Sequence, residues 1–281
     1  GHRELFHSRP VSSFLESIYR RYRYPAIILR AMVTSDLKLR YQASALGYLW
    51  TLARPLAIFS ILYVVFVKFL RIGEGTPFFA IYLLLGIVMW GLFTEATTQS
   101  LSSIVSRASL LTKINFPRYV VVLSVAASVL ISFTLNLAVI ALFMIVARVP
   151  VGWEAFWLVP LFLELIAFAL AVSLFLSALF VRFRDLNYIW EVFIQAVFYA
   201  TPILYPLTLV PERYSRVLLL SPMAQVIQDA RYVLITDQTQ TIAQLYGTGW
   251  ARAIPVGITM ALAVAAVVFF RRRSRFFAEE A

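Results

Sequence analysis

The sequence predicts an all-α membrane protein with six transmembrane helices, and three observations support that fold class. First, 61% of its 281 residues are apolar and 14% are charged, whereas soluble domains average about 45–50% apolar and about 25% charged residues. Second, six stretches contain the roughly 20 mainly apolar residues that a transmembrane helix needs. Third, the basic residues gather between those stretches, which is typical of membrane topology rather than of a groove for nucleic acid.

The spans divide the chain into a short N-terminal segment, a membrane domain and a tail. The expected spans are Leu46–Leu70, Phe78–Thr97, Arg118–Ala147, Ala155–Val181, Leu186–Tyr205 and Ala251–Phe270. With both termini in the cytoplasm, 18 of the 25 lysines and arginines lie inside, in agreement with the positive-inside rule. We therefore expect a cytoplasmic amphipathic segment over 1–45, a membrane domain over 46–270 and a basic cytoplasmic tail over 271–281.

The segment before the first span is expected to form an interfacial helix on the cytoplasmic side. Apolar residues recur at every fourth position over 26–45. They are Leu29, Val33, Leu37 and Tyr41. Asp36 and Arg40 interrupt this stripe, and their spacing lets them form an ion pair. The helix can be a simple anchor on the membrane or a moving element of a gate.

A second cytoplasmic helix is expected over 101–114. Its apolar face is formed by Leu101, Ile104, Val105, Ala108 and Leu111. Serines and Lys113 occupy the opposite face, and Pro117 limits the helix. Such a short amphipathic helix can lie on lipid or dock into the groove of a partner, and the pattern favours neither.

Two further connections differ in length. The fourth and fifth spans are joined by a tight, charged cytoplasmic corner at Arg182–Asp185. Residues 206–250 contain three prolines and only short apolar pieces. We expect re-entrant helices there on the outer side, because irregular backbone at membrane depth needs shelter from protein.

Few residues of the chain could carry out chemistry. There is no cysteine, and both histidines lie near the N-terminus, so no metal or catalytic centre is expected. No phosphate-binding loop of the G-x-x-x-x-G-K-[ST] type occurs, so ATP-driven transport would need a second chain. Glu164 lies well inside the fourth span, where a carboxyl group is costly and is a functional candidate. The alternative is a protonated glutamate bonded between helices.

Aromatic side chains form a stripe in the first span at Phe59, Tyr63 and Phe66. Phe198 and Tyr199 lie in the outer half of the fifth span. Aromatic faces can stack on sugar rings, and tyrosine hydroxyl groups can bond to sugar hydroxyls. Helix packing is the other explanation for such a stripe.

Four groups of residues, in order along the chain, resemble a known family. They are Asp36-Leu37-Lys38-Leu39-Arg40-Tyr41 with Ser44, Leu46-Gly47, Leu49-Trp50 and Pro55; Lys113 with Phe116-Pro117-Arg118; Arg182-Phe183-Arg184-Asp185; and Ser221-Pro222 with Arg231. This set resembles type-2 ABC exporter permeases, and in particular the Wzm-type polysaccharide permeases that export O-antigen, galactan or teichoic acid. Ser221 stands where the family usually has asparagine.

The resemblance implies a homodimer that binds two copies of a nucleotide-binding ABC ATPase subunit. ATP and Mg would be bound by that partner, with no cofactor on this chain. The cargo would be a polyprenyl-pyrophosphate-linked polysaccharide that crosses the bacterial cytoplasmic (inner) membrane. The implied ATPase-coupling residues are Arg107, Lys113, Phe116, Pro117, Arg184 and Asp185. Lys38, Arg40 and Arg54 would attract the lipid head group, and the sugar path would be lined by Phe59, Tyr63, Phe66, Trp90 and Tyr199.

Three alternatives remain beside this interpretation. A permease of the same architecture could export a drug or a small lipid. A membrane enzyme acting on lipid-linked sugars would need a cluster of carboxylates or histidines at one membrane face, and the sequence offers none. An ion-coupled carrier would be expected to show buried charge pairs and internal repeats.

Overall fold

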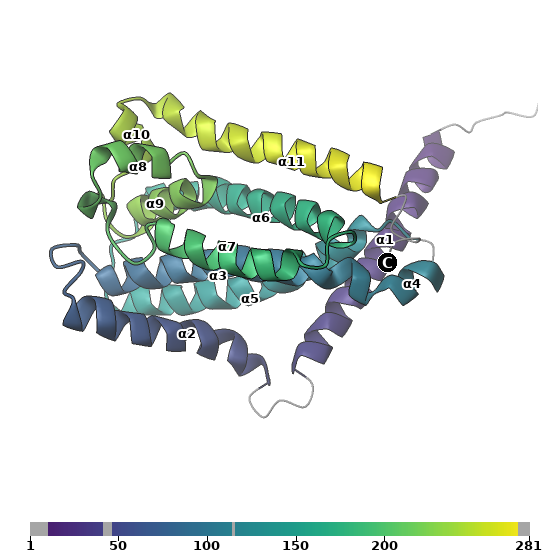
Figure 1. The fold of residues 1–281 in the computed structure, drawn as a ribbon, viewed down its shortest axis with the longest axis horizontal. Helices are drawn as coiled ribbons and strands as arrows, with labels where there is room; N and C mark the ends of the chain where they lie inside the picture. Colours follow the sequence, from purple (N-terminus) through teal and green to yellow (C-terminus); the bar gives the residue numbers. More distant parts are fainter. Residues whose placement is uncertain (1–10, 42–46, 114–115, 275–281) are drawn as a thin grey trace, which may run out of the picture.

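The computed structural model describes residues 11–41, 47–113 and 116–274, and every regular element within these ranges is helical. The long helices run side by side along the molecule (Figure 1). Their bounds, with those of the shorter helices, are α1 Val11–Tyr41, α2 Trp50–Leu62, α3 Phe79–Ser106, α4 Ala108–Lys113, α5 Tyr119–Val146, α6 Leu158–Phe180, α7 Leu186–Ala200, α8 Glu212–Leu218, α9 Pro222–Leu234, α10 Ile242–Tyr246 and α11 Ala253–Arg273. A π-helical segment, Tyr63–Phe69, continues α2.

Among the described residues, five helical segments are long and apolar enough to cross a membrane. They are Gly47–Phe69, Phe79–Ser106, Tyr119–Val146, Trp153–Phe180 and Gly249–Arg273. These segments correspond to the first four expected spans and the sixth. Leu46, at the expected start of the first span, lies outside the described residues.

The expected fifth span is shorter than a full crossing, so the six-span layout is not confirmed. α7 has 15 residues and ends at Ala200, which gives a length of about 22 Å against a hydrocarbon core of about 30 Å. Thr201 is extended, and a buried turn follows at Pro202 and Ile203. Proline lacks the backbone N–H that a helix needs, so the apolar sequence continues there without helix.

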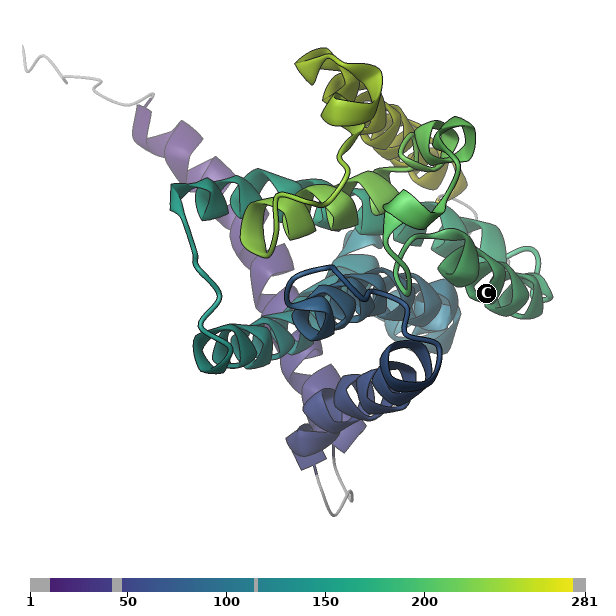
Figure 2. The same cartoon turned by 90° about the vertical axis from the view of Figure 1, so that its left-hand side faces the viewer.

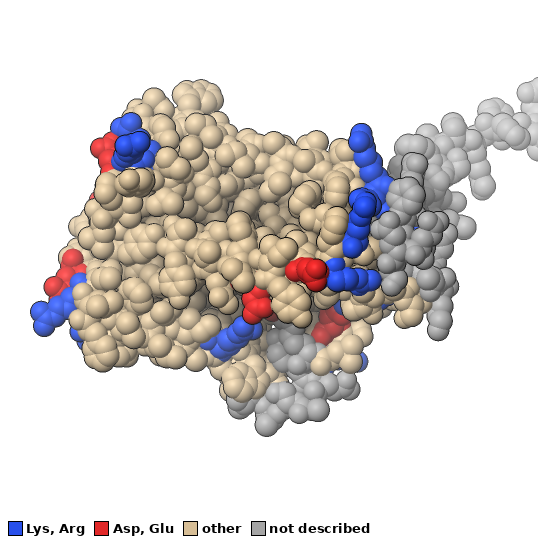
Figure 3. Space-filling model, in the orientation of Figure 1, with Lys and Arg blue, Asp and Glu red and all other residues tan. Residues whose placement is uncertain are grey.

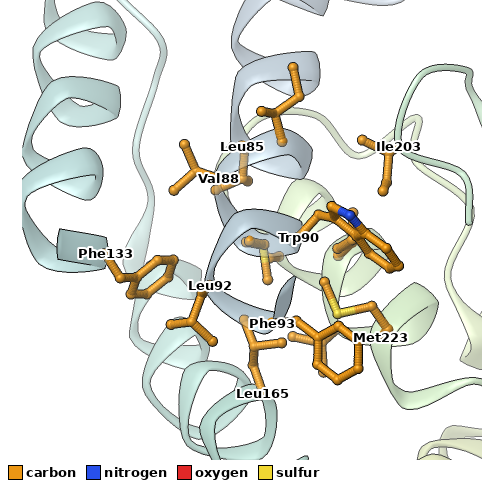
Figure 4. Close-up of a cluster of buried hydrophobic side chains, with 14 of the residues drawn as sticks. Leu85, Val88, Trp90, Leu92, Phe93, Phe133, Leu165, Ile203 and Met223 are labelled. Atoms are coloured by element: carbon orange, nitrogen blue, oxygen red, sulfur yellow. The ribbon is translucent and has the colours of Figure 1, made fainter. Parts of the chain in front are cut away.

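α3 forms the centre of the bundle. Figure 2 shows the neighbouring helices around it, and α5, α6, α7 and α9 all contact it. The core close-up in Figure 4 combines Leu85, Val88, Trp90, Leu92 and Phe93 of α3 with Phe133, Leu165, Ile203 and Met223. In the most apolar stretch of α3, 78% of the residues are buried, but in the most apolar stretch of Gly47–Phe69 only 6% are. The segment containing α2 therefore presents an open apolar surface.

Alternating helix directions place the connections at two opposite ends of the molecule. α1 and α4 lie at one end, whereas α8, α9 and α10 lie at the other (Figure 1). On the face shown in Figure 3, charged side chains gather toward these two ends and the surface between them is largely uncharged. We refer below to the α4 end and the α9 end.

The two expected cytoplasmic helices differ from their expected bounds. The sequence predicted one helix over 101–114, but α3 continues to Ser106 and the chain bends at Arg107 before the short α4. Arg107 has φ −114° and ψ 18°, which interrupts the helical hydrogen-bond ladder. The expected helix over 26–45 is longer at its start, because α1 begins at Val11.

Candidate functional site

Arg231 of α9 is the most deeply buried charged side chain in the described part of the protein, with 0% exposure. Its Nε donates to the Tyr82 carbonyl at 3.0 Å, and Nη2 donates to the Ile203 carbonyl at 2.7 Å. Nη1 donates to the Pro202 carbonyl at 2.6 Å and to Gln228 Oε1 at 3.1 Å. All four bonds go to neutral oxygens, so the guanidinium holds the non-helical segment after α7 against α3 and α9.

Two residues of α3 shape the pocket around this guanidinium. The Tyr82 ring lies under the Arg231 guanidinium at 3.6 Å, a cation–π contact, and the Tyr82 hydroxyl donates to Gln228 Oε1 at 3.2 Å. Gly86 leaves the space that the guanidinium occupies, since a Cβ there would overlap Arg231 Nη2. The sequence singled out Arg231 through a family motif but missed Gly86, whose only signal was a glycine inside an apolar helix.

The α9 helix that carries Arg231 starts at the Ser221-Pro222 pair. Pro222 occupies the first helical turn, where its missing N–H costs nothing. The Ser221 side chain forms no capping hydrogen bond. The motif therefore fixes the start of α9 through proline, and the exchange of asparagine for serine leaves the Arg231 contacts in place.

An ion pair ties α1 to the bend between α3 and α4. Arg107 Nη2 donates to Asp36 Oδ1, and both side chains are mostly shielded, with 21% and 18% exposure. Asp36 and Arg107 lie 71 residues apart in the sequence. The pair of Asp36 with Arg40 that the sequence suggested stays a prediction. The side chains of Arg40 and Lys113 lie outside the described residues.

The remaining expected coupling residues divide into exposed and buried ones. Arg184 and Asp185 are exposed at the corner between α6 and α7, at the α4 end. Phe116 is buried and packs with Met32 of α1 and Val120 of α5, and Pro117 is half-buried. Phe116 thus anchors α1 to the start of α5, while the corner between α6 and α7 is exposed.

The expected head-group residues Lys38 and Arg54 are both exposed. The expected path residues form two groups. Phe59 contacts Tyr63 with ring centroids 5.6 Å apart, and it meets Phe143 of α5 edge-on. Trp90 contacts Phe198 at 5.7 Å, and Phe198 contacts Tyr199 at 5.3 Å.

Exposure separates these aromatic residues further. Phe59 and Trp90 are buried in helix packing, Tyr63 and Phe66 are half-buried, and Tyr199 is 67% exposed. Tyr199 shares the open face of α7 with four other large side chains. They are Tyr188, Ile189, Val192 and Phe193. Both α2 and α7 therefore expose broad apolar faces beyond the bundle core.

Glu164 of α6 lines a cavity together with Asp229 of α9 and Thr259 of α11. Its Oε1 is buried and has no hydrogen-bond partner. A glutamate bonded between helices was the alternative to a functional role, and this oxygen makes no such bond. In the described part of the chain, no three Asp, Glu, His or Cys side chains cluster closely enough to hold a metal ion.

Comparison with known proteins identifies the family. Residues 28–235, well over half of the chain, match the family described as ABC-2 type transporter. The chain belongs to the ABC-2 type transporter family. Membership makes it a transport protein, in agreement with the expectation of a transporter rather than a membrane enzyme. The ABC-2 match includes the Asp36–Arg107 pair and the Arg231 pocket.

Similar proteins are named for the export of O-antigen or the transport of polysialic acid. The O-antigen export system permease protein RfbA of Klebsiella pneumoniae is 33% identical over 79% of this chain and 86% of the relative. The RfbA protein of Myxococcus xanthus is 30% identical over 92% of this chain and 96% of the relative. The polysialic acid transport protein KpsM of Escherichia coli is 21% identical over 73% of this ABC-2 chain and 80% of the relative.

Proposed function

We propose that this chain is the permease subunit of an ATP-driven exporter of a polyprenyl-pyrophosphate-linked polysaccharide of the O-antigen, galactan or teichoic-acid type. The observation that carries the proposal is the similarity to two RfbA proteins over most of their lengths. The exporter would lie in the bacterial cytoplasmic membrane with both termini in the cytoplasm. The α4 end would then face the cytoplasm, and most lysines and arginines would lie on that side, as the positive-inside rule requires.

In this proposal, a sixth crossing is formed by α7 together with residues 201–205. Support comes from Figure 1, where α7 starts near the α4 end and α8 lies at the α9 end. Between these two ends, α7 and residues 201–205 must therefore cover about the same distance as the neighbouring spans. Shelter for the non-helical part comes from Arg231, whose hydrogen bonds satisfy the carbonyls of Pro202 and Ile203.

Two copies of the chain would enclose the export path. The open apolar faces of α2 and α7 favour this arrangement, because a bundle with one helix so little buried has surface left for a partner or for lipid. Tyr199 offers an exposed ring for stacking on sugars, and the half-buried Tyr63 and Phe66 lie on the π-helical extension of α2. The exposed Lys38 and Arg54 would attract the anionic pyrophosphate head.

Two copies of a separate ABC ATPase would dock at the α4 end. The exposed Arg184 and Asp185 would contact it, together with Lys113 on α4. The Asp36–Arg107 pair and the packing of Phe116 would carry its motion into α1 and α5. ATP and Mg would be bound by the ATPase, because this chain has no phosphate-binding loop.

Purification of the tagged chain from its native membranes tests the proposal. We expect an ABC ATPase and a lipid-linked glycan to elute with it. The charge reversal Arg184→Glu should reduce recovery of the ATPase, while the control Arg213→Glu at the α9 end should not. Recovery of a drug-like molecule or a small lipid in place of the glycan would favour the alternative cargo, and absence of any ATPase would contradict the proposal.

A further inference from the structure

A cavity of about 580 Å³ lies between α6, α9 and α11, apart from the Arg231 pocket. These three helices contact one another near the α9 end (Figure 1). Most of the cavity wall is apolar, and its outer edge includes Leu163 and Met260, which are 61% and 62% exposed. Because α6 and α11 are candidate membrane spans, this edge opens toward the lipid.

Four polar atoms lining this cavity have no hydrogen-bond partner, although all of them are buried. They are Glu164 Oε1, Gln225 Oε1, Asp229 Oδ1 and Thr259 Oγ1. Gln225 and Asp229 are each 1% exposed, and Thr259 is 3% exposed. Buried polar atoms are normally bonded. Each of these four oxygens can accept a hydrogen bond, so the cavity is suited to a ligand that donates several.

The charges at the cavity favour a positively charged donor. Asp229 Oδ2 already accepts from Gln225 Nε2 at 2.8 Å and pairs with Arg252 Nε at 3.1 Å. Glu154 and Glu164 add two further carboxyl groups to the wall, whereas Arg252 is its only basic side chain among the described residues. A primary ammonium group carries one positive charge and three N–H donors, which matches both the charge and the free acceptors.

The position of Arg252 adds a second requirement. Its side chain is 45% exposed, so the guanidinium can bind another anion while Nε stays on Asp229. A guanidinium suits a phosphate group well. A ligand with an ammonium group, a neighbouring phosphate and an apolar body would satisfy the acceptors, the arginine and the apolar wall together.

We propose that this cavity binds the head group of a phospholipid with a primary amine, with Asp229, Glu164 and Thr259 around the ammonium and Arg252 at the phosphate. The acyl chains would leave through the open edge between Leu163 and Met260. The volume lies within the range of about 300–1,000 Å³ that is usual for small-molecule pockets. This site does not depend on the identity of the exported cargo or on the ATPase.

Native mass spectrometry of the purified full chain in detergent tests the site. Phosphatidylethanolamine, phosphatidylcholine and phosphatidylglycerol are offered in equal amounts. Phosphatidylcholine keeps the phosphate and the charge but has no N–H donor. We expect phosphatidylethanolamine to be retained about tenfold more than phosphatidylcholine, which corresponds to about 1.4 kcal/mol.

Matched variants assign the signal to the cavity. Thr259→Val and Glu164→Gln should each reduce the preference for phosphatidylethanolamine severalfold. Thr134→Val, at an exposed threonine of α5, and Glu191→Gln, at an exposed glutamate of α7, should not. Equal retention of the three lipids, a preference for phosphatidylglycerol, no retained lipid, or a preference unchanged in both cavity variants would each overturn the proposal.

Discussion

Replacement of Gly86 by alanine should destabilise the protein through Arg231. The new methyl group would overlap Nη2 and would lie 3.2 Å from Arg231 Cζ and 3.3 Å from Ile203 Cγ2. The guanidinium can clear it only by giving up the Nη2 bond to the Ile203 carbonyl. A hydrogen bond from a charged donor contributes about 1.5–3 kcal/mol, and the better helix propensity of alanine returns about 0.5–1 kcal/mol. The net expectation is a loss of about 1–2 kcal/mol.

Reversible unfolding in mixed detergent micelles measures this change as a difference in the free energy of unfolding. Gly91→Ala is the matched control, because Gly91 lies on the same helix and a Cβ there meets nothing within 4 Å. This control should be as stable as the unmodified protein or up to about 1 kcal/mol more stable. If the Gly86 variant is as stable as the Gly91 variant, the guanidinium is not confined as the structure indicates.

Three further predictions concern other contacts. Arg231→Lys should lower the free energy of unfolding by about 3 kcal/mol in the same assay, because one ammonium nitrogen cannot reach the separate carbonyls that the guanidinium bonds. Unchanged stability would contradict the role of Arg231 in holding the segment after α7. Asp36→Asn should lower the free energy of unfolding by about 1–2 kcal/mol and expose α1 to protease. The control Glu212→Gln, in an exposed ion pair, should change neither the stability nor the proteolysis. Equal proteolysis of both variants would contradict the ion pair that ties α1 to the end of α3. Tyr199→Ala should reduce export of the polysaccharide in cells without reducing co-purification of the ATPase, and normal export would remove this residue from the path.

Sequence reasoning found the long helices because each required only a local property, a run of about 20 apolar residues. It was less successful where a helix ends inside an apolar run. The end of α7 at Ala200 depends on Pro202 and on Arg231, which bonds the carbonyls beyond the helix from a position 28 residues or more away. Hydrophobicity alone cannot distinguish that buried turn from a helix.

The ion pairs show the same limit. The contact of Asp36 with Arg107 joins residues 71 positions apart, which no local pattern indicates, whereas the expected pair of Asp36 with Arg40 stays a prediction. The bend at Arg107, which brings its side chain to α1, also divided the expected helix over 101–114. The apolar pattern of that segment was nevertheless informative, since Leu101 and Ile104 are both fully buried.

The central claim is that this chain moves a lipid-linked polysaccharide only when a separate ATPase drives it. Proteoliposomes that contain the chain, its co-purifying ATPase and internally loaded lipid-linked polysaccharide test it directly, with an external glycosidase reporting each polymer that crosses. We expect cleavage that requires ATP and both proteins. Equal cleavage without the ATPase, or none with the complete system and ATP, would contradict the claim.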